Sequence, residues 1–483
     1  MRRTLYLTVL FAVGAALQAQ TTTPWTLQRA VEYALDNNLQ VRQLNNLTQL
    51  NELNLQQARN ARLPTASGST NVGAQLGRTI DPTTNEFEQQ TIGFQGYQLQ
   101  AGVTLYNGGR IKNGLRQAEY DLAAARLDAD VTANNVGLQV ANSYLNVVLL
   151  REQLNNARAQ LTLTEGQLAN TDALIRAGTL PAAQRFDLVA TQAANQRSIV
   201  ELENQIDLAE LSLKLLLELD YNEPFSVATP DLDPTVEQLM DTYDLEETFL
   251  AARTTQPTVA AAQLRQESAA AGVELARAGL RPTVSLFGSL STNYSTVAKD
   301  FSNPEIGPIM AEFGPAIPVQ INGQDATLAE IVNNTDVTFP NLGYFNQLER
   351  NFGQSVGLAV NVPIYSQGIN KLNVQRAELQ RLNAGLDIEQ AENQLRNDVQ
   401  LALANLRGAQ QSYRAAQTSL EAAQQAADNA QRSFRAGAAN SLDLVTANNR
   451  LEQARIEFTR AKYQLIFNRQ VIRFYRGEGF TLE

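Results

Sequence analysis

The side chains that most often carry catalysis are missing from this sequence of 483 residues. It has no histidine and no cysteine, which excludes imidazole bases, thiol nucleophiles, thiolate metal sites and disulfides. Any enzyme built from it would depend on carboxylates, hydroxyls, lysine or tyrosine. A carboxylate-based glycosidase needs two acids converging in one cleft, and nothing in the sequence indicates such a cleft. We therefore expect no enzymatic activity and no cofactor.

Acids and glycines do recur in one specific arrangement. The tripeptide Arg-Ala-Gly occurs at 176–178 and at 435–437, and each copy is soon followed by Asp-Leu-Val, beginning at Asp187 and Asp443. Each copy interrupts a long tract of helical composition, and glycine suits the left-handed residue that ends a helix. Pro181 suits an early position of the next helix in the first copy, and Asn440 and Ser441 both suit an N-cap in the second. The repeat predicts two tight helix reversals.

The composition and the N-terminus restrict the class of protein. The net charge is −11, so nucleic acid is not an expected partner. Arg2 and Arg3 precede an apolar stretch and small residues that end at Ala19. We expect residues 1–19 to be a cleaved secretory signal, with an ordinary N-terminal core helix as the alternative. Since no other apolar run approaches the length of a spanning helix, membrane insertion would have to use strands.

The two halves of the chain match in order. Each contains a helix, two strands, a very long helix, a break and a further helix. We expect a first repeat at 20–220, a proline-rich linker at 221–244, a second repeat at 245–476 and a C-terminal tail at 477–483. The matched blocks are 27–38 with 245–256, 62–69 with 280–288, which places Pro64 on Pro282, and 103–122 with 361–379.

Long helices dominate both halves. The first helix should run from about Thr26 to Arg62, and the very long helices from 110 to 175 and from 367 to 434, on the order of 100 Å each. The second of these has apolar residues at alternating spacings of three and four, which is a coiled-coil seam. A plain two-helix coiled coil fits this seam as well as a wall of helices does. The seam residues are Leu406, Ala409, Tyr413, Ala416, Leu420, Ala423, Ala427, Ala430 and Phe434.

The segments after Pro64 and Pro282 have a period of two. One predicted strand alternates Val356, Leu358, Val360 and Val362 with small or polar residues, and another places Tyr97, Leu99, Ala101, Val103 and Leu105 on one face. Their length suits strands that cross a bilayer at a tilt, although each alone would also fit a soluble sheet. Four strands cannot close a membrane barrel. We therefore expect three copies of the chain to form a single barrel of twelve strands together. The segment from 295 to 350 should be an extracellular loop.

This order of elements resembles the TolC family of outer-membrane efflux ducts. The resemblance covers essentially the whole mature chain and rests on the repeat, the strand pairs, the returns "LYNGG" and "IYSQG" into long helices, and the two Arg-Ala-Gly segments. It implies a mostly helical chain whose homotrimer forms a barrel in the outer membrane and a tunnel through the periplasm. The implied partners are a periplasmic adaptor protein, an inner-membrane pump of the RND or ABC class, and outer-membrane lipid.

The same resemblance assigns functional residues. In members of the family, acidic residues just after the second helix reversal form a ring around the periplasmic aperture. Here Asp443 holds the first acidic position, while Thr446 replaces the second, so the ring would have one Asp per chain. An outer-membrane-anchored structural coiled-coil protein without transport is the alternative function. Adaptor docking maps to the glycine-containing tips, which implies contacts by Arg176, Ala177, Gly178, Arg435, Ala436 and Gly437.

Overall fold

The computed structural model describes residues 24–80, 86–89, 91–220, 222–229, 241–307, 310–313, 316–328, 331–334, 337–436 and 438–478. The predicted signal peptide, Gly437, part of the predicted linker and most of the predicted tail lie outside the described residues. The chain divides into two compact units. One comprises the segment up to Asn54 with residues 118–269 and those from Gln380 onward, and the other comprises 55–117 and 270–379. Each unit therefore draws on both halves of the sequence.

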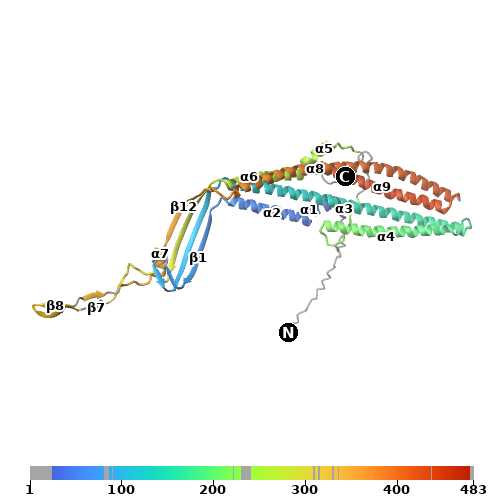
Figure 1. The fold of residues 1–483 in the computed structure, drawn as a ribbon. Helices are drawn as coiled ribbons and strands as arrows, with labels where there is room; N and C mark the ends of the chain where they lie inside the picture. The colour runs from blue at the N-terminus through green and yellow to red at the C-terminus, as the bar shows by residue number, and fades with distance from the viewer. Residues whose placement is uncertain are drawn as a thin grey trace, which may run out of the picture. The chain divides into compact units, whose positions relative to one another are not determined.

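A four-stranded antiparallel sheet forms the centre of the second unit (Figure 1). Its order is β1-β4-β5-β12, so strands from the two halves meet between β4 and β5, and β1 and β12 are the edges. The first strand of each pair begins directly after Pro64 or Pro282, and the four predicted strands are confirmed. Their bounds are β1 Thr65–Gln75, β4 Ile92–Tyr106, β5 Thr283–Ser295 and β12 Gly353–Asn361.

The predicted alternation of β4 is interrupted near its end. A register shift between Thr104 and Tyr106 leaves Leu105 without a partner in the pairing and brings Tyr106 opposite Val284. The extra residue therefore places Tyr106 on the same face as Val284 and Leu286.

Short ribbons fill the connections between the long strands. The segment between β5 and β12 is a long interrupted hairpin followed by the helix α7, Tyr344–Arg350. Its innermost turn is Asn322–Gly323, where both residues have positive φ, which is the type I′ turn that suits a two-residue hairpin. The paired strands are β2 Arg78–Ile80 with β3 Phe87–Gln89, β6 Glu305–Ile306 with β11 Val337–Thr338, β7 Met310–Phe313 with β10 Ile331–Asn334, and β8 Ile317–Ile321 with β9 Gln324–Leu328.

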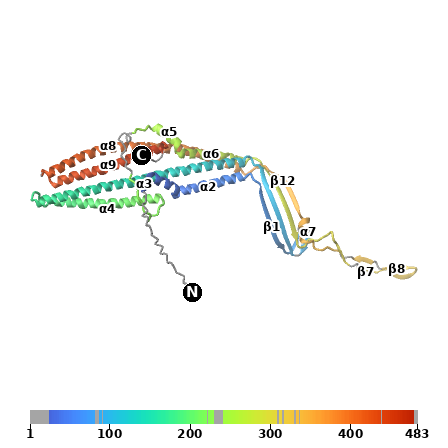
Figure 2. The same cartoon turned by 180° about the vertical axis from the view of Figure 1, so that it is seen from behind.

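The long helices have the predicted bounds to within one or two residues. The helices α3 and α8 have 67 residues each, and α3–α4 and α8–α9 run side by side as antiparallel pairs (Figures 1 and 2). No helix among the described residues has an apolar stretch long enough to cross a bilayer. The bounds are α1 Leu27–Asn37, α2 Leu39–Asn60, α3 Arg110–Arg176, α4 Gln184–Leu216, α5 Leu245–Thr255, α6 Pro257–Ala278, α8 Ile369–Arg435 and α9 Ser441–Tyr475.

The predicted single helix from Thr26 to Arg62 is instead two helices that meet at Asn38. The backbone of Asn38 has a non-helical ψ of 132°, and the side-chain amide of Asn38 donates a hydrogen bond of 3.1 Å to the carbonyl of Leu216. The second half repeats this break at Gln256, whose amide donates to the carbonyl of Phe474 at 3.1 Å. Each break thus fixes a short helix to the end of the helix that returns from a tip.

The predicted seam of α8 is buried at six of its nine positions and half-buried at Leu420, Ala423 and Ala430. Leu406, Ala409 and Tyr413 are each less than a tenth exposed, and the ring of Tyr413 lies 5.3 Å from that of Phe458 on α9. The same core contains Tyr144, whose hydroxyl donates to main-chain carbonyls at 3.0 and 2.7 Å. Burial raises the pKa of this phenol to about 12, so it remains a donor at physiological pH.

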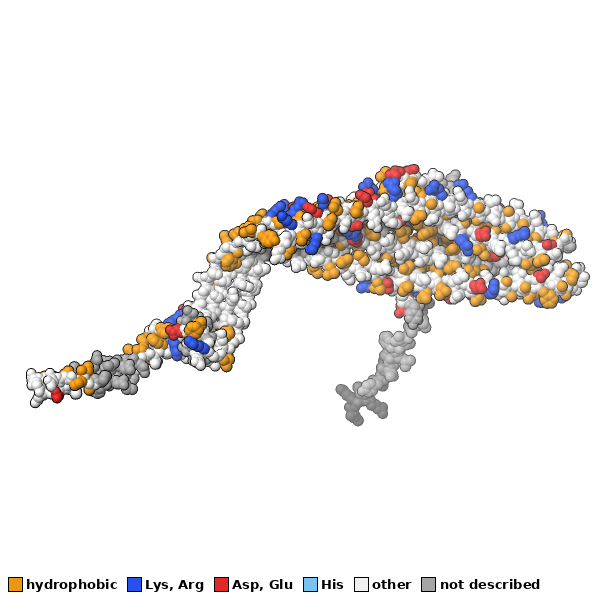
Figure 3. Space-filling view, in the orientation of Figure 1, with side chains coloured by type: hydrophobic (Ala, Val, Ile, Leu, Met, Phe, Trp, Pro, Cys, Tyr) orange, Lys and Arg blue, Asp and Glu red, His pale blue; other side chains and the backbone are white. Residues whose placement is uncertain are grey.

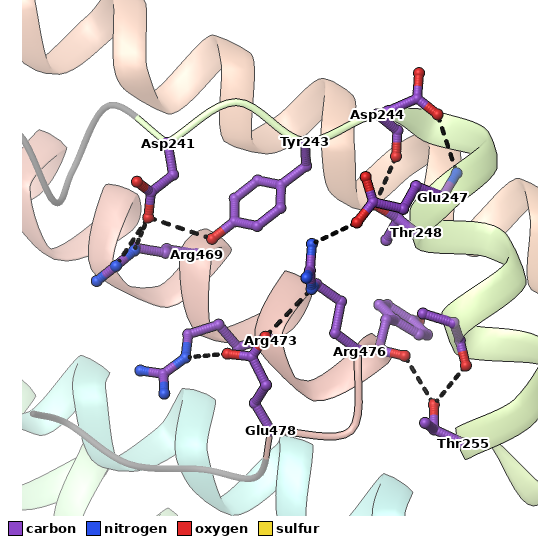
Figure 4. Close-up of polar contacts among 12 residues, drawn as sticks. Asp241, Tyr243, Asp244, Glu247, Thr248, Thr255, Arg469, Arg473, Arg476 and Glu478 are labelled. Carbon is purple, nitrogen blue, oxygen red and sulfur yellow. Dashed lines mark hydrogen bonds and ion pairs between the residues drawn. The ribbon is translucent and has the colours of Figure 1, made fainter.

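Polar contacts also hold the end of α9 against α5 and the segment before it (Figure 4). The guanidinium of Arg469 contacts Asp241 at 2.9 Å, and that of Arg476 lies 3.6 Å from Glu247 and 3.2 Å from Glu478. These ion pairs are partly exposed, so we assign each a small contribution to stability and a larger one to the orientation of the chain end.

Candidate docking surface and aperture at the hairpin tips

The first tip is a tight turn that depends on the conformation of one glycine. Gly178 has φ of +71°, its amide donates to Ile175 at 3.0 Å, and the next amide donates to Leu174 at 3.0 Å. These two bonds are the Schellman pattern that ends a helix. A Cβ added at Gly178 would meet nothing within 4 Å, so backbone conformation, and not space, requires glycine. The predicted early helical position of Pro181 is wrong, because α4 begins only at Gln184 after a further turn.

The second tip lies between α8, which ends at Arg435, and α9, which begins at Ser441. Asn440 is the N-cap, as predicted, and its side chain accepts a hydrogen bond of 2.8 Å from the amide of Asp443. The amide of Ala436 continues the helical pattern to Arg432 at 3.1 Å. Gly437 lies outside the described residues.

The structure brings both tips of one chain together. The hydroxyl of Ser441, at the start of α9, lies 3.2 Å from the carboxylate of Asp187 near the start of α4. Farther from the tips, the buried amide of Asn448 donates to Gln167 of α3 at 3.2 Å. The predicted docking residues within the described part of the chain are all exposed: Arg176, Ala177, Gly178, Arg435 and Ala436.

The two predicted aperture residues lie on one exposed strip of α9. Asp443 is in the first turn and Thr446 follows three residues later, both exposed. Residues at this spacing are neighbours on a helix surface. Their counterpart in the first half, Asp187, differs because it accepts the hydrogen bond from Ser441. Within the described residues, no cluster of three or more acidic, histidine or cysteine side chains could hold a metal ion.

The structure adds two residues that sequence reasoning missed. Phe186 and Leu442 are 69% and 60% exposed, and each directly precedes the Asp of Asp-Leu-Val. The leucines of that motif, Leu188 and Leu444, are fully buried. Each tip therefore exposes one large apolar side chain to solvent, two residues before a leucine that is buried in the helix packing. Aligning the two copies at Asp-Leu-Val would have revealed this, because the residue before Asp is apolar in both.

A cavity of about 460 Å³ lies beside the tips, between α3 and α8. Arg435 and Phe434 contribute to its wall, so one of the predicted docking residues borders it. Its volume is within the range of pockets that accept side chains or small ligands. The lining residues are Gln167, Asn170, Ala173, Leu174, Gln431, Phe434, Arg435 and Leu444.

The sheet has one mainly polar face, which also carries Phe94 and Phe287, and one mainly apolar face, which also carries Gln354. Cross-strand pairing places Ser67, Gln100, Ser289 and Ser355 in one row on the polar face. The sheet surface toward the viewer in Figure 3 is largely without hydrophobic or charged side chains. The other face has large exposed apolar residues, including Val356 at 80%. This face also carries Leu99, Val103, Leu286, Leu290, Leu358 and Val360.

Comparisons with known proteins agree with this architecture. The family model described as outer membrane efflux protein matches residues 30–218 and 251–478, which is most of the chain. The pyoverdine export outer membrane protein OpmQ of Pseudomonas putida is 30% identical over 209 residues, which span only 43% of this chain and 43% of that relative. The outer membrane efflux protein BepC of Brucella suis is 21% identical over 94% of this chain and 85% of its own length.

The same fold occurs in a solved structure. The outer membrane protein VceC of Vibrio cholerae superposes with a TM-score of 0.70 at 14% identity, covering 94% of this chain and 97% of that one. The resemblance to outer-membrane efflux ducts is thus confirmed at the level of the family and the fold. With its buried coiled-coil seam, two-faced sheet and helix reversals, the chain belongs to the outer membrane efflux protein family.

Proposed function

We propose that this protein is the passive outer-membrane duct of a tripartite efflux or type I secretion system. The observation that carries the proposal is the sheet, which has one apolar face, one polar face and two open edges. The helices α3 and α8 extend on the order of 100 Å, longer than a globular domain requires. A sheet that faces lipid on one side and water on the other, continued by long helices, suits a conduit without chemistry of its own.

The open edges argue for a homotrimer. In lipid, each unpaired backbone group of β1 and β12 would cost several kcal/mol, so the edges must be paired. Two chains would supply eight strands, a number that side chains tend to fill, whereas three would supply twelve and leave a channel. The polar row through Ser67 and Ser355 would then line that channel.

The tips are the surface that we assign to partners. The exposed Arg176, Ala177 and Gly178 lie at one tip, and Arg435, Ala436 and Gly437 belong to the other. A periplasmic adaptor protein would dock there and couple the duct to an inner-membrane pump of the RND or ABC class. The apolar side chains of Phe186 and Leu442 extend this surface, because exposed apolar groups beside polar ones are typical of protein contacts.

We assign the aperture to Asp443 and Thr446. Three copies of Asp443 around one axis would favour cations in the narrowest part of the duct. Residues 1–19 would direct secretion. Each of the two repeats, 20–220 and 245–476, would supply one strand pair and one helical hairpin. The linker 221–244 would join the repeats, and the tail 477–483 would follow the second. The duct would thus lie in the outer membrane and extend into the periplasm.

Two measurements test this function. Purified trimers in planar bilayers should conduct ions, whereas a structural coiled-coil protein without transport would not. In cells, Gly178→Asp should abolish export because it places a charged side chain at a residue of positive φ on the docking surface. Gly437→Asp, and bulky substitutions at Ala436, should do the same at the second tip.

The matched control is Gly166→Asp. Gly166 is an exposed glycine of α3 with nothing within 4 Å of an added Cβ, so the same charge is introduced away from the tip. Trimer yield in the outer membrane should be unchanged for all these variants. Normal export by the tip variants would refute the docking assignment, and absence of conductance would refute the duct.

A further inference from the structure

The short helix α7 is fixed to the end of the long strand β5. The side chain of Gln347 is buried and accepts a hydrogen bond of 2.9 Å from the amide of Ser295. The hydroxyl of Thr292 donates to the carbonyl of Leu348 at 2.7 Å, and Asn351 donates to the carbonyl of Asn293 at 2.8 Å. These contacts hold a seven-residue helix that would not be stable alone.

Aromatic residues place α7 on the apolar face of the sheet. The hydroxyl of Tyr344 lies 2.9 Å from that of Tyr97, and its ring centroid lies 4.8 Å from that of Tyr294. Tyr97 shares its face with Leu99, which the pairing assigns to the apolar side. Phe345, next to Tyr344, is 80% exposed. The helix therefore lies outside the polar row, with the ring of Phe345 against that of Tyr344 and largely exposed to the surroundings.

An aromatic residue also lies at the other end of the apolar face, where Tyr106 pairs with Val284 and is 50% exposed. Tyr365, which matches Tyr106 in the second half of the sequence, follows β12 and is 85% exposed. From Tyr97 to Tyr106, roughly nine residues at about 3.3 Å each and a tilt near 40° give a height of about 23 Å. None of the residues of β1, β4, β5 and β12 is charged. An uncharged band of this height between aromatic girdles is typical of a lipid-facing barrel surface.

Two neighbouring hollows lie on this face below α7. Their volumes are about 320 and 460 Å³, and Leu99 and Leu290 border both. The small residues Gly68 and Gly288 contribute to them, and Phe352 borders the larger one. Leu99, Leu290 and Val356 supply most of the large apolar surface around them, and Gln354 and Gln98 also contribute, so acyl chains are suitable occupants of the apolar part.

We propose that α7 is an interfacial helix that rests on the outer leaflet of the membrane and fixes how deep the sheet sits. Phe345 inserts at the boundary between headgroups and acyl chains, the tyrosine hydroxyls lie at headgroup level, and acyl chains fill the hollows below. This inference rests on the proposed function, which assigns the apolar face to lipid. It adds that α7 lies against lipid and does not cover the pore.

The absence of cysteine makes a direct test available, since any introduced cysteine is the only thiol. A nitroxide would be attached at single sites of the trimer in phospholipid vesicles. Collision rates with oxygen, which concentrates in lipid, and with a water-soluble nickel chelate would then be compared. The sites are Phe345→Cys, its exposed neighbour Asn346→Cys, Leu99→Cys for the middle of the apolar face, and Ser289→Cys for the polar face.

The expected result is an oxygen-to-nickel ratio several-fold higher at 345 than at 346, and highest at 99. A water-exposed label at 345 together with a lipid-exposed label at 99 would overturn the interfacial helix and leave the duct intact. Lipid exposure at both 345 and 346 would also overturn it, because α7 would then be immersed. Water exposure at 99, or lipid exposure at 289, would contradict the assignment of the faces and hence the proposed function itself.

Discussion

At the scale of single residues, the two halves use the same amino acids for different purposes. Asp187 and Asp443 occupy the same place in the repeat, yet Asp187 accepts a hydrogen bond from Ser441 while Asp443 is exposed and contributes its backbone amide to the cap. The structure therefore distinguishes a carboxylate that joins the tips from an exposed one, to which the proposed function assigns the aperture.

Replacing Asp443 should change ion selectivity. In Asp443→Asn trimers we expect a lower ratio of cation to anion permeability, because three negative charges leave the aperture. The reversal potential under a salt gradient in planar bilayers measures this ratio. Asp187→Asn is the matched control and should leave the ratio unchanged. Equal ratios for Asp443→Asn and the native protein would remove Asp443 from the aperture.

Glu452 should make stability depend on pH. Burial raises the pKa of its carboxyl, Arg455 opposes this, and one of its oxygens is buried without a hydrogen bond. The folded state thus favours the protonated carboxyl of Glu452. Its contribution to the stability of the fold is fully present below the ordinary pKa near 4.5 and is lost as pH rises through the raised pKa. Glu452→Gln should raise the thermal midpoint at pH 7.5 and leave it nearly unchanged at pH 4. A uniform shift at both values would contradict this origin.

At the scale of elements, the repeated helix break is a device that joins distant parts of the chain. Asn38 and Gln256 each end one short helix, and their amides bind carbonyls at the ends of α4 and α9. Both side chains are less than a tenth exposed. A buried amide that bonds a distant carbonyl fixes both where a helix ends and what it packs against.

Removing either amide should destabilise the helical unit. We expect Asn38→Ala and Gln256→Ala each to lower the free energy of unfolding by about 1–3 kcal/mol, since each removes a side-chain hydrogen bond made by a buried amide. Because the two sites are on different helices, their effects should add. Thermal unfolding followed by circular dichroism measures this. Asn51→Ala, which removes only a local bond within α2, should have little effect, and an equal loss there would refute the argument.

At the scale of the whole molecule, the sheet is incomplete in a single chain. Its apolar face exposes Val356 at 80% and its edges β1 and β12 have no partner strand among the described residues. Neither feature is stable in water or in lipid without further copies. The proposed assembly of three chains would cover both the apolar face and the two edges.

Adjacent residues of β12 should respond in opposite ways to the same charge. Val356→Arg places a charge on the apolar face and should cost about 2–4 kcal/mol near the middle of the bilayer, which depletes trimers from the outer membrane. Ser355→Arg places it on the polar face and should leave the trimer yield unchanged while altering conductance. Trimer yield in membrane fractions measures the difference. A similar loss for both would contradict the two-faced sheet.

The sequence by itself determined the local structure. The period of two after Pro64 and Pro282, the seam of α8 and the glycine at 178 each predict the element that is found, because they depend on neighbours within a few residues. The order of the matched blocks was enough to indicate the family. The fold of the tips followed from Gly178 and Asn440 for the same reason.

Only the tertiary structure decided features that depend on residues far apart in the chain. The break at Asn38 needs the carbonyl of Leu216, the bulge at Leu105 appears only once β4 pairs with β5, and the position of α7 depends on Tyr97. The exposure of Phe186 and Leu442 likewise follows from which helix faces pack together. Hydrogen bonds and packing across such separations have no periodic signature, so no window of sequence contains them.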